Sequence, residues 1–328
     1  AAYNTFGGTD AGSNVSGSDS NTGIGYRAFY TLVTGNNNTA VGKEALKTLN
    51  GAHHNTAVGQ YALKNQTTAS YNTAIGQGVG EEITTGANNT LVGSSIANSS
   101  ATTCTRNTAV GHAAGQMMTT CADNVFVGYY AGQANTTGYD NVHIGKMAGK
   151  TATTSYGDTF VGKDAGYSRS GGNSSVGIGY KTLYSIEGPN WVVAVGGSAG
   201  YNLTNGHYNT ILGHTTGYNI TTGTNNTCLG YGAGNNGSPS GQITTGSNNF
   251  VLGDNYISNL YCADTSISSS DQRDKTDVTS FNIGLAWIEA LRPITYRWDR
   301  RTWYGTDAEP YGTPDGSKKR SKLHIGFL

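Results

Sequence analysis

Residues 38–59 read NTAVGKEALKTLNGAHHNTAVG, so the motif Asn-Thr-Ala-Val-Gly occurs twice and ends at Gly42 and again at Gly59, a 17-residue period. Variants of this motif run through most of the chain. The motif glycines stand at positions 8, 25, 42, 59, 76, 93, 111, 128, 145, 162, 179, 196, 213, 230 and 253. Most intervals between them equal this period. The exceptions are the step from 93 to 111, longer by a single position, and the last step, from 230 to 253. Such a regular period predicts a repeat architecture.

A 17-residue period is too short for a helical hairpin repeat and suits one coil of a parallel β-solenoid. We expect residues 1–253 to form an all-β shaft or head of about fifteen coils, each with two short strands joined by two turns. Coils stacked about 4.8 Å apart would make a rod about 70 Å long. The long last interval contains residues 235–240, which predicts a loop insertion in one coil.

The apolar positions of the motif predict which side chains face inward. The residue before the glycine is apolar in 14 of 15 coils, and the residue three before it is Thr or apolar. These two positions share one face of a strand, and we expect that face to line the coil. The residue between them points the other way and is also small or apolar, as in Ala40, Leu91 and Phe160. We therefore expect this second face to pack against other copies of the chain, in a homotrimer.

Two further features of the motif predict how the coil turns. Asn stands four residues before the glycine in 12 of 15 coils, where stacked copies would form a ladder at one corner. Small residues such as Ala165-Gly166 follow the motif glycine three and four residues later, which predicts tight corners.

The repeat resembles the head repeats of trimeric autotransporter adhesins, whose Asn-x-x-Ile-Gly-like coils build a trimeric parallel β-roll and which also occur in phage fibre proteins. The resemblance covers about residues 1–253 and implies a trimer. That family's coils are usually shorter than the period found here.

The repeat stops after Gly253, and residues 254–269 are expected to be a connector. Ser269-Ser270-Asp271-Gln272-Arg273-Asp274-Lys275 resembles the Ser-Asp-x-Arg-x-Lys opening of the intramolecular chaperone peptidases at the ends of phage tail spikes and fibres. Residues 284–298 and 324–328 continue that family's pattern, so residues 270–328 are expected to be the first part of such a domain, with a short helix over 283–291. The chain itself is expected to be a piece of a longer protein.

The second resemblance implies that this domain assists trimer assembly and then cuts itself free. Ser270 would be the nucleophile, Lys275 the base, and the bond cut would join Ser269 to Ser270. A lysine acts as such a base only when its pKa is depressed. Taken alone, a Ser five residues before a Lys also fits an exposed turn.

Composition limits the other functions. Charged residues make up 12% of the chain, the formal net charge is zero, and no apolar stretch is long enough to span a membrane. We expect no nucleic-acid partner, no membrane insertion, no cofactor and no zinc site. The basic residues 318–322 are expected to lie in a solvated loop.

A few further residues carry hypotheses of their own. Cys104 and Cys121 are expected in adjacent coils, either as a disulfide or as two reduced thiols. Cys228 and His143 are expected on the face between chains, where His143 is a candidate for a metal site on a three-fold axis. A file of Thr residues suggests an ice-binding face, against which Val and Phe replace Thr in later coils.

We expect a structural and adhesive protein of a phage tail, located in the virion and acting outside the cell at the host surface. Its partners would be a glycan or protein receptor and other tail proteins, with tyrosines stacking on sugar rings. The alternatives are a polysaccharide-degrading tail spike and a bacterial trimeric surface adhesin. Substrate-directed activity is not expected, because acidic residues are sparse and Glu81-Glu82 is the only adjacent pair in the coils.

Overall fold

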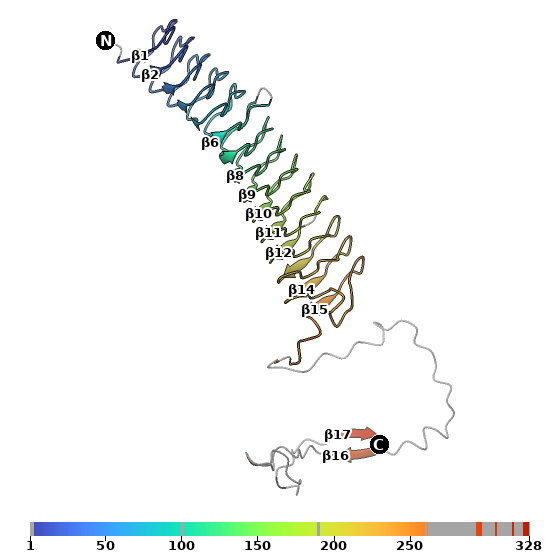
Figure 1. The fold of residues 1–328 in the computed structure, drawn as a ribbon. Helices are drawn as coiled ribbons and strands as arrows, with labels where there is room; N and C mark the ends of the chain where they lie inside the picture. The colour runs from blue at the N-terminus through green and yellow to red at the C-terminus, as the bar shows by residue number, and fades with distance from the viewer. Residues whose placement is uncertain are drawn as a thin grey trace. The chain divides into compact units, whose positions relative to one another are not determined.

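A computed structural model describes residues 3–99, 102–188, 191–259, 261, 293–296, 306, 317 and 324–327. The chain divides into two units, Ala1–Leu260 and Tyr261–Leu328. The first unit is a parallel β-solenoid of about fifteen coils, as predicted. Figure 1 shows its strands following one another along one side of the stack.

Each coil contributes one short strand, and each strand pairs in parallel with the next along the chain. The strands are β1 (Thr5–Gly7), β2 (Thr22–Ile24), β3 (Thr39–Val41), β4 (Thr56–Val58), β5 (Thr73–Ile75), β6 (Thr90–Ser94), β7 (Thr108–His112), β8 (Val125–Val127), β9 (Val142–Ile144), β10 (Thr159–Val161), β11 (Val176–Ile178), β12 (Val193–Val195), β13 (Thr210–Leu212), β14 (Thr227–Leu229) and β15 (Phe250–Leu252). The expected second strand is reduced to single-residue bridges, such as Tyr139 to Tyr156.

The assignment of faces from the sequence was wrong, and the two faces are exchanged. The middle residue of each strand points into the coil: Ala40, Leu91 and Phe160 are fully buried. The two flanking positions point outward, so that Ile24 and Val195 are 43% and 37% exposed. Alternation along a strand correctly groups the residues, but both groups are apolar here, so hydrophobicity alone does not say which group faces in.

In several coils the core is filled by a size match between the middle strand residue and the residue six positions later. A large middle residue faces a glycine, as Phe126 faces Gly132, where a Cβ atom would lie 2.5 Å from the Phe126 ring. In other coils a small middle residue is matched by a large one, as Ala40 is by the buried Leu46. Beside Ala109, by contrast, the space at Gly115 is filled by Met118 and by Phe126 of the next coil. Since interiors are close-packed, this reciprocity fills the coil where it occurs, and side chains of the next coil fill it elsewhere.

The motif glycines permit the close approach of successive coils. Gly25 has a φ of +128°, and a Cβ atom there would lie 2.6 Å from the carbonyl oxygen of Gly42 in the next coil. The other corners are left-handed even at non-glycine residues, for example Glu44 at φ 57° and Leu46 at φ 47°. The turns therefore depend on alternating backbone handedness as well as on glycine.

The predicted asparagine ladder is confirmed. The backbone N–H of Asn55 donates to Oδ1 of Asn38 at 2.9 Å, and that of Asn72 donates to Oδ1 of Asn55 at the same distance. These side chains are buried, and their amides also donate to main-chain carbonyls, as Asn55 does to Ala69. The ladder thus satisfies buried backbone groups at the corner before most of the strands.

In the second unit, β16 (Pro293–Tyr296) and β17 (His324–Phe327) form an antiparallel pair in which Tyr296 lies opposite His324. Two separate blocks of the chaperone-like pattern therefore pair with each other. The expected helix over 283–291 lies outside the described residues.

Candidate functional surfaces

The outward face of the fifteen-stranded sheet carries an apolar strip. We define the strip as the outward third residues of β2–β15: Ile24, Val41, Val58, Ile75, Val92, Val110, Val127, Ile144, Val161, Ile178, Val195, Leu212, Leu229 and Leu252. A parallel file of Thr, Val and one Phe, the first residue of each strand, runs beside it. Neither file contains a charged residue, and all their positions are described.

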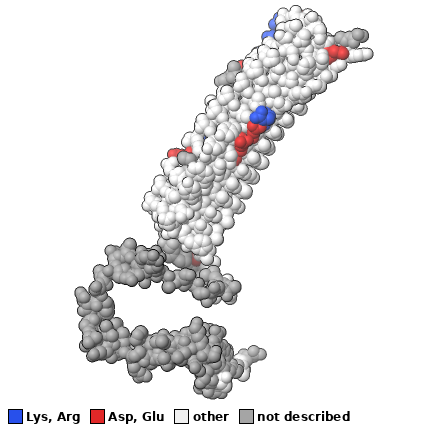
Figure 2. Space-filling view, turned by 180° about the vertical axis from the view of Figure 1, so that it is seen from behind, with Lys and Arg blue, Asp and Glu red and all other residues white. Residues whose placement is uncertain are grey.

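The strip is a continuous file of apolar residues, whereas apolar residues on an ordinary protein surface are scattered singly. Ile24, Ile75 and Ile178 are each at least 40% exposed although they lie in strands as far apart as β2, β5 and β11. Figure 2 shows that charged side chains on the face it draws stand in a few small groups. Contiguous apolar surface of this kind marks an interaction site, and parallel sheets are ordinarily covered on both faces.

Tyrosines follow other files of the solenoid, where they stack on each other. The rings of Tyr167, Tyr184, Tyr201 and Tyr218 lie with their centroids 5.0, 5.0 and 4.9 Å apart, and their planes are within 9° of parallel. Tyr139 and Tyr156 stack in the same way. Because each inner ring covers its neighbour's face, Tyr184 and Tyr201 present edges and hydroxyls to solvent.

The stacking changes the expected use of these tyrosines. Lysine ammonium groups cover further ring faces: Lys163 lies 5.3 Å from the centroid of the exposed Tyr180, and Lys150 lies 5.2 Å from that of Tyr167. A sugar ring needs an uncovered aromatic face. Within these described stacks, an uncovered face is therefore left only on a ring at the end of a file.

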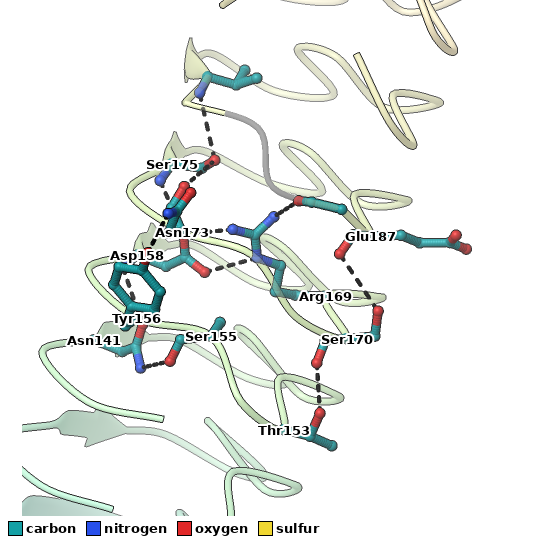
Figure 3. Close-up of polar contacts among 12 residues, drawn as sticks. Asn141, Thr153, Ser155, Tyr156, Asp158, Arg169, Ser170, Asn173, Ser175 and Glu187 are labelled. Atoms are coloured by element: carbon teal, nitrogen blue, oxygen red, sulfur yellow. Dashed lines mark hydrogen bonds and ion pairs between the residues drawn. The ribbon is translucent and has the colours of Figure 1, made fainter. Parts of the chain in front are cut away.

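A buried ion pair interrupts the asparagine ladder (Figure 3). Asp158 and Ser175 replace two ladder asparagines, and Val192 replaces a third. Arg169, at a position where many other coils have Leu or Ile, donates to both carboxylate oxygens of Asp158 at 2.8 and 3.0 Å. It also donates to the carbonyl of Gly188 at 2.6 Å. Burial raises the pKa of the Asp158 carboxyl, and the guanidinium opposes that shift.

The ladder function survives this replacement, because Asp158 accepts the backbone N–H of Ser175 at 2.9 Å. Sequence reasoning did not find the pair. Its signal was an Asp at the ladder position together with an Arg at a position that is apolar in most coils.

His143 lies inside its coil and does not face other chains. Its fully buried ring is sandwiched between Phe126 and Phe160, with both centroid distances 5.3 Å. Neither ring nitrogen has a hydrogen-bond partner among the described residues, and burial lowers the pKa of His143 to about 3. The proposed metal site on a three-fold axis therefore loses its basis, because a side chain enclosed in one coil cannot meet its copies.

The three described cysteines are free and buried. Of the two alternatives for Cys104 and Cys121, the structure has the reduced thiols, and the contact with Cys104 together with burial raises the pKa of Cys121. Cys228 also points into the core, where burial raises its pKa to about 11. The expectation that Cys228 lies between chains was wrong for the same reason as for His143.

The adjacent acidic pair is engaged in surface contacts. Glu81 lies 3.3 Å from the Lys64 ammonium, which also approaches Glu44 at 3.8 Å. Glu82 accepts a hydrogen bond from the amide of Asn65 at 3.2 Å. Among the described residues, no group of three or more His, Cys, Asp or Glu could hold a metal ion. In the same part of the chain, no helix is long and apolar enough to cross a membrane.

Ser269, Ser270 and Lys275 lie outside the described residues. Residues 270–328 match the family described as chaperone of endosialidase. No curated protein and no solved structure is similar enough to the chain to be matched with it. The family match and the β-solenoid body together fit a fibre or spike protein of a phage tail.

Proposed function

We propose that this chain is part of a trimeric tail fibre or spike that attaches a phage to its host. The solenoid serves as shaft or head, and residues 270–328 as the start of a chaperone that assists assembly. The apolar strip is the observation that carries this proposal, because it is an uncharged sheet face that water alone would cover in a single chain.

Two further copies of the chain are the occupants that fit the strip. Another copy has the same coil spacing and an equally long uncharged face, so apolar side chains can meet apolar side chains along the whole rod. Three copies around one axis form a closed arrangement and leave no strip exposed. The chaperone match supports the same assembly, since its family is associated with trimeric tail proteins.

The test is the absolute mass of the full chain, measured by light scattering behind a sizing column. We expect the mass of three chains. Val195→Asp, in the strip, should shift the mass to one chain, because it buries three uncompensated carboxylates near the axis. Thr154→Asp, at an exposed position outside the strip, is the matched control and should leave the trimer intact.

A stable, soluble monomer would overturn the trimer. The outward file of Thr, unbroken from Thr5 to Thr108 at the first residue of the first seven strands, would then be tested for ice binding by thermal hysteresis. The structure turns this file outward, contrary to the expectation from sequence.

For residues 270–328 we propose self-cleavage between Ser269 and Ser270. The Ser270 hydroxyl attacks the carbonyl of Ser269 while its proton passes to Lys275, and the Ser270 nitrogen is released as an amine. Water then hydrolyses the resulting ester. This role rests on the family match and on the spacing of the two residues.

We favour adhesion to a host glycan or protein over hydrolysis of a polysaccharide. Hydrolysis of glycosides requires two opposed carboxylates, and the adjacent pair Glu81 and Glu82 is held by Lys64 and Asn65. Release of reducing sugar from host polysaccharide by the purified chain would reverse this preference. The proposed location is the tail of the virion, in contact with the host surface and with other tail proteins.

A further inference from the structure

The longest interval between motif glycines builds a pocket. Between Gly230 and Gly253 the extra residues form a loop that is closed by its own main-chain bonds, with Ile243 donating to Gly234 at 2.9 Å and Asn255 to Gly237 at 2.7 Å. The Asn235 amide ties this loop to the preceding coil through the carbonyl of Thr215 at 2.7 Å. The resulting pocket has a volume of about 240 Å³.

Tyr231 supplies a wall of this pocket and an open aromatic face. Its ring stacks on His214 with a centroid distance of 5.9 Å and planes 3° apart, so one face is covered. The next residue in its file is Asp254, and no described ring covers the second face. Tyr231 is 64% exposed, more than any inner member of the tyrosine stacks.

The remaining lining groups are polar and carry no positive charge. Asp254 and Tyr256 complete the pocket, and one carboxylate oxygen of Asp254 accepts the Tyr256 N–H at 3.0 Å. The second carboxylate oxygen and the tyrosine hydroxyls can bond sugar hydroxyls. In the described part of the chain neither Lys nor Arg lines the pocket, which disfavours an anionic sugar. The volume is below that of a drug-sized site and suits one sugar ring.

We infer that this pocket binds one uncharged monosaccharide unit of a cell-surface glycan. The sugar ring stacks on the open face of Tyr231, and its hydroxyls donate to Asp254. This inference deepens the adhesive part of the proposed function and rests on it. It assigns recognition to the irregular coil and not to the regular tyrosine stacks.

The experiment titrates the full chain with methyl glycosides of neutral hexoses and N-acetylhexosamines, followed by saturation-transfer NMR. We expect at least one glycoside to bind, Tyr231→Ala to weaken it roughly tenfold, and Asp254→Asn to weaken it less. Tyr71→Ala is the matched control, because Tyr71 is also exposed and stacked on a histidine, His54, but does not line this pocket. It should bind as the unmodified chain does.

Failure of every glycoside to bind would overturn the inference, as would equal binding by the Tyr231 and control variants. Binding of phosphocholine instead of any glycoside would overturn the ligand class, because two tyrosines and a carboxylate also suit a quaternary ammonium. The mass of each sample is recorded in parallel. A trimer that binds none of the glycosides would leave the proposed fibre role in place and overturn only this binding site.

Discussion

Arg169 and Asp158 form a bidentate ion pair inside the solenoid, and both side chains are fully shielded from solvent. Arg169 stands where Leu32, Ile186 and Leu203 stand in other coils, and Asp158 stands in the asparagine ladder. Both residues of the ion pair therefore differ from the residue type that is usual at their positions in the repeat.

We predict that removing one partner of this ion pair lowers the free energy of unfolding strongly, and that replacing both partners does not. Arg169→Leu leaves a buried carboxylate without its partner and should cost about 3–5 kcal/mol of unfolding free energy. Arg169→Leu with Asp158→Asn recreates the regular coil and should recover most of that loss. Thermal unfolding of the two variants measures the difference. Equal stability of the single and double variants would contradict the coupling.

His143 should make the solenoid sensitive to acid. Its pKa is lowered to about 3 in the folded chain, against about 6.5 in an unfolded one. The unfolded chain therefore binds more protons between these values, and stability is lost as pH falls through that window by about 1.4 kcal/mol per pH unit.

The control for this effect is His143→Phe, which completes an aromatic stack with Phe126 and Phe160 and leaves Gly149 in place. We expect the unfolding midpoint of this variant to fall less between about pH 6.5 and about pH 4.5 than that of the unmodified chain. Parallel loss in both proteins would show that other groups dominate the acid response.

The size match within the coil predicts a compensating pair of substitutions. Gly132→Leu should destabilise the solenoid by overpacking against Phe126, at a cost of about 1–3 kcal/mol or more because Gly132 also has a φ of +56°. Adding Phe126→Ala recreates the Ala40 and Leu46 combination and should restore part of the stability. Gly237→Ala is the neutral control, because no described atom lies within 4 Å of a Cβ atom there.

Self-cleavage predicts a discrete product. The protein, expressed as its gene encodes it, should yield a fragment whose last residue is Ser269. Ser270→Ala and Lys275→Ala should each abolish it, whereas Lys275→Arg distinguishes a base from a mere charge, because arginine stays protonated. Mass spectrometry gives the cut site, and a cut elsewhere would contradict the assignment.

The period and the corner chemistry were readable from the sequence alone. The regular spacing of the motif predicted the parallel stack, and repeated Asn predicted the ladder that Asn38 and Asn55 form. These inferences succeed because a repeated backbone demands the same residue at each strained corner.

Which face of each strand points into the coil was not predicted correctly from the sequence. Val41 is larger and more apolar than Ala40, so hydrophobicity favoured the wrong face. A signal for the inward face was the reciprocal size of residues six apart in several coils, such as Phe126 with Gly132, because an enclosed volume must be filled without overlap. The long last interval predicted a loop, but not that the loop would leave the Tyr231 face open.

Because the fifteen strands pair in register, the number of coils sets the length of the solenoid. Each of the strands β1–β15 pairs only with the strand before it and the strand after it, so adding or deleting one whole period would preserve this pairing pattern. Each such event alters the rod by about 4.8 Å. Recombination between near-identical motifs, such as those in β3 and β4, would supply these events. The length of the solenoid can thus evolve in fixed steps while the chemistry of its coils stays constant.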